Sequence, residues 1–170
     1  KLRMYQVKKS LVIHGAHPSM MHPGHRQAVP LITNHIPEKI TASMATMPER
    51  MNALEDVIKS ILPQVSELYI YLNGFDYIPG FLENEKIHLI NSQDHVGDIG
   101  DAGKFFPARE ISGYHFTVDD DILYPPDYCQ VMIAAIESYH RRCIVTLHGR
   151  RFKSMPVVSY YHNDARTCQC

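Results

Sequence analysis

A run of three consecutive aspartates directly after an apolar segment constrains this chain more than any other feature. The segment Gly113–Val118 is rich in aromatic and β-branched residues, which is typical of a buried strand. Asp119, Asp120 and Asp121 (the acidic triplet) follow without a spacer, and Pro125-Pro126 then prevents the strand from continuing. Because like charges repel, adjacent carboxylates oppose one another's ionisation unless a cation lies among them. The sequence therefore predicts a positive partner for the acidic triplet.

We interpret the acidic triplet as a divalent metal site. Ligand sets made only of oxygen suit Mg²⁺ or Mn²⁺. Open α/β sheets bind their ligands beyond the carboxyl ends of the strands, where the triplet is expected to lie. A phosphate-bearing substrate is the expected partner of such a metal. The alternative is an acidic turn that is solvated at the strand end, but such turns rarely follow an apolar strand so abruptly.

Composition argues against several classes of protein. The chain has 170 residues, of which 45% are hydrophobic and 21% charged, as is ordinary for a globular protein with its own core. A formal net charge of -1 provides no basic field for nucleic acid or an anionic membrane. No apolar run is long enough for a transmembrane segment. The 4 cysteines do not suggest a disulfide framework, so free thiols in a reducing, cytoplasmic compartment are expected.

Strand-like and helix-like patterns alternate along the chain. This alternation is typical of the α/β class, with right-handed crossovers and a Rossmann-type, mostly parallel sheet flanked by helices. We expect one domain over residues 38–150, a linker over 1–37 and a tail over 151–170. The predicted strands are 39–46, 67–72, 86–90, 113–118 and 143–147, and the predicted helices are 46–62, 101–111 and 128–139.

Polar residues near the ends of the first two strands are candidate ligand contacts. Thr46 and Glu49 have the spacing of a capping box, and Pro48 suits the first turn of a helix. Arg50 on that turn either faces a nucleotide base or phosphate, or is a solvated helix residue. Asn73 is either a plain turn residue or a polar group at a crevice rim. A strand, a tight turn and a capped helix together form a ligand crevice at the strand's carboxyl end.

The glycine-rich segment 94–106 leads into the acidic strand. Asp101 is the expected cap of the helix that follows, and Lys104 near that helix start would complete an anion site. The spacing matches neither a P-loop nor the dinucleotide glycine fingerprint, so the segment alone is a weak indication. His148 follows the last predicted strand, at the edge expected to carry the aspartates, and is the candidate catalytic side chain.

In their order along the chain, these motifs resemble the GT-A glycosyltransferases, and within them the α-N-acetylglucosaminyltransferases of bacterial heparosan capsule synthesis. The match covers about residues 38–150. The acidic motif with its Tyr-Pro-Pro-Asp-Tyr continuation is the most specific part. The matching pieces are Pro48…Arg50, Leu72-Asn73, Asp101…Gly103-Lys104-Phe105, Thr117–Tyr128 and Val145-Thr146-Leu147-His148-Gly149.

The resemblance implies a metal-dependent hexosyltransferase that uses UDP-N-acetylglucosamine, with Mn²⁺ or Mg²⁺ as cofactor and retention of the α-anomer. The implied partners are a glucuronic-acid-ended glycan acceptor and other capsule-synthesis proteins, at the inner face of the membrane. Such enzymes continue past the His-Gly strand into an acceptor-binding half, so we expect a truncated GT-A-like sheet that is inactive alone. By similarity, Asp119 and Asp121 would bind the metal, and Asp119 and Asp120 would lie near the ribose, base or metal. The donor-nucleotide half would be lined by Thr46, Arg50, Asn73, Asp101 and Lys104.

Two other classes of function remain open. Nucleotidyltransferases also combine acidic residues with a metal on an α/β sheet, but they use a nucleoside triphosphate and release pyrophosphate. A non-catalytic fragment that binds a nucleotide sugar would bind without turnover. A screen of nucleotide donors separates these classes, whereas the sequence identifies no nucleophile or general base.

Overall fold

The computed structural model describes residues 3–6, 13–14, 38–147, 150–152 and 165–167. The chain divides into two compact units. The larger unit contains residues 12–20 and 32–129, and the smaller contains residues 1–11, 21–31 and 130–170. The predicted site residues from Thr46 to Asp121 all belong to the larger unit.

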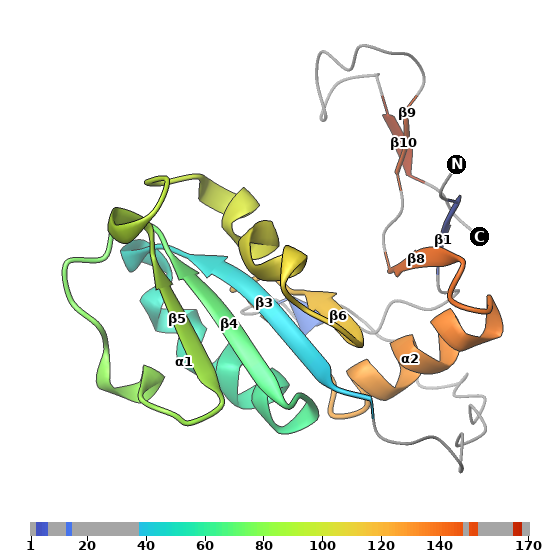
Figure 1. The fold of residues 1–170 in the computed structure, drawn as a ribbon, viewed down its shortest axis with the longest axis horizontal. Helices are drawn as coiled ribbons and strands as arrows, with labels where there is room; N and C mark the ends of the chain where they lie inside the picture. Colours follow the sequence, from blue (N-terminus) through green and yellow to red (C-terminus); the bar gives the residue numbers. More distant parts are fainter. Residues whose placement is uncertain (1–2, 7–12, 15–37, 148–149, 153–164, 168–170) are drawn as a thin grey trace. The chain divides into compact units, whose positions relative to one another are not determined.

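A four-stranded sheet forms the centre of the larger unit (Figure 1). Its strands are β3 (Ile40–Thr46), β4 (Glu67–Leu72), β5 (Ile87–Asn91) and β6 (Tyr114–Thr117), in the order β5-β4-β3-β6. Every neighbouring pair is parallel, so the carboxyl ends of the strands meet at one edge. The predicted α/β class with a Rossmann-like parallel sheet is confirmed, and β4 has the predicted bounds.

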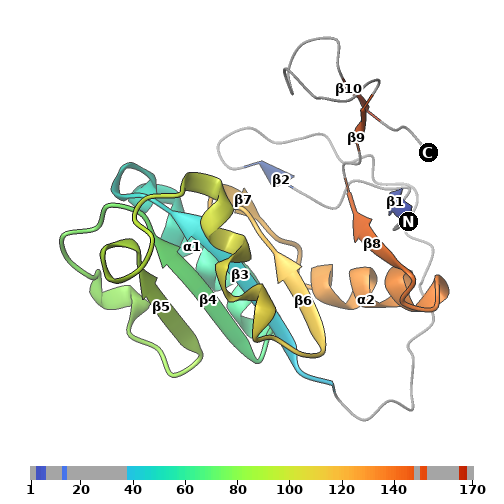
Figure 2. The same cartoon turned by 45° about the horizontal axis from the view of Figure 1, so that its top comes forward.

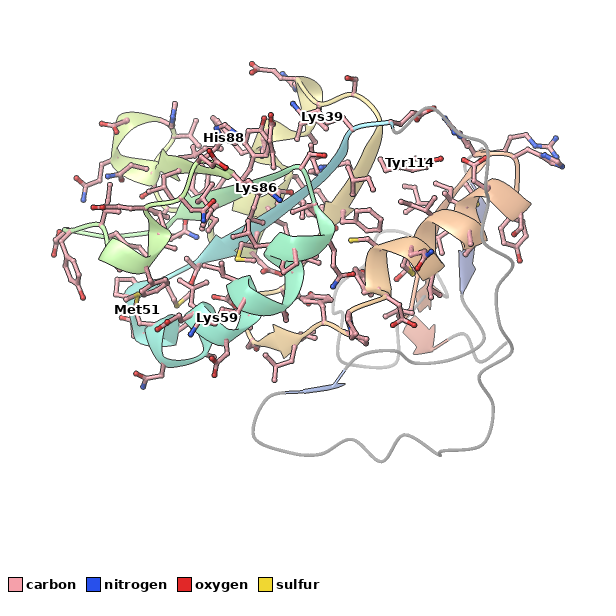
Figure 3. The ribbon with its side chains drawn as sticks, turned by 90° about the horizontal axis from the view of Figure 1, so that it is seen from below. Lys39, Met51, Lys59, Lys86, His88 and Tyr114 are labelled. Atoms are coloured by element: carbon pink, nitrogen blue, oxygen red, sulfur yellow. The ribbon has the colours of Figure 1, made fainter. Side chains whose placement is uncertain are left out.

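One face of the sheet is apolar and packs against α1 (Met51–Ile61), which Figure 3 shows along one side of the sheet. Alternate residues of a strand point to the same face. On this face the register aligns Ala42 with Leu68 and Met44 with Ile70, and all four side chains are fully buried. The helix supplies the matching apolar stripe at helical spacing. Its buried residues are Leu54, Val57, Ile58 and Ile61.

The connection from β3 to α1 differs from the prediction. A 3-10 turn, η1 (Pro48–Arg50), leads into the helix, and its N-cap residue Met47 makes no side-chain cap. The predicted capping box between Thr46 and Glu49 is wrong, because Thr46 is still part of β3 and lies one residue before the cap position. At its other end the helix stops as predicted, in the proline-containing 3-10 turn η2 (Leu62–Gln64).

The opposite face of the sheet is covered by η5 (Gly100–Arg109), a 10-residue run of 3-10 helix drawn in yellow-green in Figure 2. Tyr71 of β4 points to this side, and a Cβ atom at Gly103 would lie 2.6 Å from its ring, so the close approach requires glycine. The Tyr71 hydroxyl donates a hydrogen bond to the Gly97 carbonyl at 2.8 Å, which also fixes the loop before η5.

Shorter elements complete the larger unit. The loop from β4 to β5 contains η3 (Gly80–Leu82), and η4 (Ser92–Asp94) follows β5. After β6, β7 (Ile122–Leu123) pairs in antiparallel fashion with β2 (Ile13–His14). The helix α2 (Tyr128–Ser138) follows within one residue of its predicted bounds, and all but its first two residues belong to the smaller unit.

The strand after α2 does not join the four-stranded sheet. β8 (Cys143–Thr146) pairs in parallel with β1 (Arg3–Gln6), so the prediction that it extends the main sheet is wrong. β9 (Arg150–Phe152) pairs in antiparallel fashion with β10 (Ala165–Thr167). His148 follows β8 but lies outside the described residues, so its catalytic role stays a prediction. Among the described residues, no helix is long and apolar enough to cross a membrane.

Candidate functional site

A cavity opens beside the carboxyl ends of β3 and β4. Its wall combines the end of β3, the turn η1, the residue after β4 and the start of η5 with one aspartate of the acidic triplet. The topology therefore brings together several polar residues predicted as ligand contacts from distant parts of the sequence. The lining residues are Ala45, Thr46, Met47, Arg50, Asn73, Gly100, Asp101 and Asp120.

Tyr124 holds the acidic triplet at the end of β6. The Val118 amide donates to the Ser43 carbonyl of β3 at 2.9 Å, and the Asp119 amide then donates to the Tyr124 hydroxyl at 2.7 Å. Tyr124 is buried, and its own amide donates to Ser60 Oγ of α1 at 3.1 Å. Burial raises the pKa of Tyr124. The sequence predicted no separate role for Tyr124, because the only available signal was its position shortly after the acidic triplet.

Arg50 is the positive partner of two members of the triplet. Its Nη1 donates to Asp121 Oδ2 at 2.6 Å and to Asp120 Oδ1 at 3.2 Å. The hydrogen bond to Asp121 and the charge of Asp120 raise the pKa of Arg50. The Asp120 side chain is only 8% exposed, whereas that of Asp121 is 53% exposed. Burial raises the pKa of Asp120, although the Thr46 hydroxyl and Arg50 oppose this effect.

Lys104 is the positive partner of the third aspartate. Its Nζ lies 2.6 Å from Asp119 Oδ1 and 3.0 Å from Asp101 Oδ2, and the side chain is 13% exposed. Burial alone would lower the pKa of Lys104, but the hydrogen bonds to Asp119 and Asp101 outweigh burial and raise it. The prediction that Asp101 caps the helix is wrong, because Ile99 is the N-cap of η5 and makes no side-chain cap. Two protein cations therefore meet the acidic triplet.

Thr46 Oγ1 is a buried polar atom without a hydrogen-bond partner in the described part of the chain. The residue is 2% exposed and lines the cavity. Its hydroxyl influences the pKa of the nearby Asp120 carboxyl but lies outside the limits of a hydrogen bond. An unpaired buried hydroxyl costs about 1–3 kcal/mol. Such an atom in a cavity wall indicates where a polar atom of a ligand would bind.

Asn73 fixes the start of η5. Its Nδ2 donates to the Gly100 carbonyl at 3.1 Å, and the Ile99 amide donates to its Oδ1 at 3.2 Å. The residue is buried, and Gly74 after it takes a φ of 66° that glycine adopts readily. Asn73 is therefore more than a turn residue, because it connects the end of β4 to the helix that carries Lys104.

A polar cluster of Thr41, Ser43 and His115 lies between the sheet and η5. Ser43 Oγ donates to the Lys104 carbonyl at 2.5 Å and lies 3.0 Å from His115 Nε2. The other ring nitrogen of His115 lies 3.0 Å from Thr41 Oγ1. Burial lowers the pKa of His115. Sequence reasoning missed this cluster, for which a histidine inside an otherwise apolar strand was the available signal.

The donor set at the triplet suits a divalent cation that is shared with a phosphate. In the described ranges, no three acidic, histidine or cysteine side chains converge as a complete metal site. Proteins commonly hold Mg²⁺ with one or two carboxylates plus the phosphates of a substrate. Asp119 and Asp121 are 46% and 53% exposed, and each directs one oxygen to a protein cation. The second oxygen of each would be available to a metal bound together with a phosphate ligand.

No protein-family model matches the chain, and no curated protein matches it significantly.

Proposed function

We propose that this chain binds a UDP-sugar together with Mn²⁺ or Mg²⁺, as the donor-binding part of a GT-A glycosyltransferase that acts on a glycan. UDP-N-acetylglucosamine is the donor that the motif order favours, and synthesis of a capsular or glycosaminoglycan-like polysaccharide is the corresponding process. One observation carries the proposal. Asp120 of the acidic triplet and the unpaired Thr46 Oγ1 line one cavity beside the carboxyl edge of an all-parallel sheet.

The polar groups of the site suggest that the nucleoside and the diphosphate would bind to different residues. A nucleoside offers ribose hydroxyls and a base N–H, which suit the unpaired Thr46 hydroxyl and the inward-facing Asp120 carboxylate. A diphosphate needs positive partners, and the candidates are Arg50, Lys104 and a divalent cation at Asp119 and Asp121. The carboxylates of Asp119 and Asp121 are about half exposed, whereas the Asp120 carboxylate is 8% exposed and lines the cavity.

Sugar transfer breaks the bond between the anomeric carbon and a diphosphate oxygen, so charge develops on the leaving diphosphate. The bound divalent cation supplies Lewis-acid neutralisation of that charge. Lys104 is largely buried and adds a compact positive charge, which has a stronger effect in a partly desolvated site than in water. Tyr124 and Asn73 orient the segments that carry these groups through the hydrogen bonds described above.

Calorimetry of UDP binding, with Mn²⁺ and with EDTA, tests the proposal. UDP is expected to bind only with the metal, and Asp121→Asn should weaken that binding by about tenfold or more. Asp56→Asn is the control, because it removes one exposed carboxylate from α1 outside the cavity lining. Equal UDP affinity in EDTA and Mn²⁺, or in Asp121→Asn and the wild type, would contradict the metal role.

Two further measurements separate the proposal from its competitors. A preference for UTP over UDP-N-acetylglucosamine, with release of pyrophosphate, would favour a nucleotidyltransferase. Transfer of radiolabelled sugar from UDP-N-acetylglucosamine to a glucuronic-acid-ended oligosaccharide would support the glycosyltransferase. Binding of the nucleotide sugar without transfer to any glycan would favour a non-catalytic binding module.

A further inference from the structure

The carboxylates that a metal would need are already paired with protein cations. Lys104 Nζ lies 2.6 Å from Asp119 Oδ1, and Arg50 Nη1 lies 2.6 Å from Asp121 Oδ2. A divalent cation that enters the site alone must therefore displace an ammonium or a guanidinium group from each carboxylate, or share that carboxylate with it.

The charges of the site explain why these pairs form. Four carboxylates, those of Asp101 and the acidic triplet, surround the two cations, so the fully ionised cluster carries a net charge of -2. A bare diphosphate would meet repulsion from this cluster, whereas a divalent cation would neutralise most of the diphosphate's charge and reduce that repulsion. The protein cations, once displaced, would be close to the phosphates.

We infer that Lys104 and Arg50 are exchangeable counterions, which pair with the acidic triplet in the empty site and move to the diphosphate when a divalent cation occupies Asp119 and Asp121. This inference rests on the proposed function. The exchange gives Asp119 and Asp121 the metal as their partner and gives the two protein cations the phosphates, which matters because an uncompensated charge in a partly buried site is costly. Thr46 Oγ1 is unpaired in a cavity that Arg50, Asp101 and Asp120 also line, which points independently to a ligand beside the partners of Lys104 and Arg50.

The exchange makes metal and nucleotide bind cooperatively. In the empty site the protein cations compete with the metal, so the metal alone binds weakly. When the nucleotide arrives, the same cations gain phosphate partners, and the metal no longer competes with them. Because coupling between two ligands is reciprocal, UDP should raise the affinity for Mn²⁺ by the same factor by which Mn²⁺ raises the affinity for UDP. Removing a protein cation should therefore raise the affinity for the metal alone and lower the affinity for UDP in the presence of the metal.

The test measures Mn²⁺ binding without nucleotide by electron paramagnetic resonance, and UDP binding at saturating Mn²⁺ by calorimetry. Lys104→Met keeps most of the apolar stem and removes the charge. Arg50→Gln is the second variant, because it removes the charge of a side chain that is 44% exposed and keeps a hydrogen-bond donor for the carboxylates. Lys59→Met is the matched control, since Lys59 lies on α1, is labelled in Figure 3, and pairs with Glu55 at 2.7 Å.

Lys104→Met and Arg50→Gln are each expected to bind Mn²⁺ alone several-fold to about tenfold more tightly than the wild type, and UDP with Mn²⁺ about tenfold more weakly. Lys59→Met should change neither affinity. If both site variants bind Mn²⁺ alone no more tightly than the wild type, while the wild type binds UDP with Mn²⁺, the exchange is refuted and the proposed function stands. If the wild type binds no UDP with Mn²⁺, both are refuted.

Discussion

Replacing Gly103 by alanine tests whether the packing of η5 on β4 sets the position of Lys104. A Cβ atom at residue 103 would lie 2.6 Å from Tyr71 Cδ1, 2.7 Å from its Cγ and 2.9 Å from its Cβ. The ring cannot move aside easily, because Tyr71 is 1% exposed and its hydroxyl is bound to the Gly97 carbonyl. Overpacking of this kind costs about 1–3 kcal/mol, whereas the glycine-to-alanine change itself favours a helix by about 1 kcal/mol at most. The free energy of unfolding should therefore fall by about 1–2 kcal/mol.

Urea unfolding followed by circular dichroism measures this loss. Gly80→Ala is the control, because a Cβ atom at Gly80 would have no other atom within 4 Å. Adding Tyr71→Leu to Gly103→Ala should recover part of the loss if the clash is its cause. Since η5 must shift away from the sheet, Gly103→Ala should also weaken metal-dependent UDP binding. A Gly103→Ala protein with wild-type stability and wild-type UDP affinity would refute this account of the packing.

Two other residues give sharp predictions. Tyr124→Phe removes the acceptor of the Asp119 amide, so the free energy of unfolding in urea should fall by about 1–3 kcal/mol. Metal-dependent UDP binding should also become weaker. An unchanged unfolding midpoint would contradict a stabilising role for this hydrogen bond. Burial lowers the pKa of His115 from its ordinary 6.5, so the unfolded state binds more protons than the folded state below that pH. Its contribution to stability should be complete above pH 6.5 and decline as the pH falls below it. The melting temperature of the wild type should therefore fall more steeply than that of His115→Gln as the pH is lowered across this range. If the two melting temperatures change in parallel with pH, His115 is not the cause of the acid destabilisation.

The parts of the fold that follow a simple period were predictable. The apolar residues of α1 recur at helical spacing and are the ones that bury against the sheet. The segment 67–72 has a strand pattern and its bounds agree with β4. The sequence pattern of a strand was less informative about where that strand lies in the sheet. Gly113–Val118 was predicted as a buried strand, but β6 lies at the end of the strand order and only Val118 is fully covered.

The pairing of charges at the site could not be read from the sequence. Arg50 and Asp121 are 71 positions apart, and Lys104 and Asp119 are 15 apart, so only the order of the strands brings them together. Thr46 and Asp101 were assigned capping roles because their local spacing allowed them. The fold instead keeps Thr46 inside β3 and directs Asp101 to Lys104. Local propensity was therefore overridden by strand pairing at Thr46 and by the ion pair with Lys104 at Asp101.

The elements on the two faces of the sheet are attached differently, which sets the order in which the parts of the site form during folding. On one face α1 is attached through a continuous apolar layer. On the other face, η5 is attached through hydrogen bonds made by Ser43 and Asn73, and the loop before it through one made by Tyr71. Only Gly103 and Pro107 of η5 are buried. Segments with few buried apolar contacts open locally before the whole protein unfolds. The half of the site that carries Lys104 is therefore expected to be completed last during folding and lost first during unfolding.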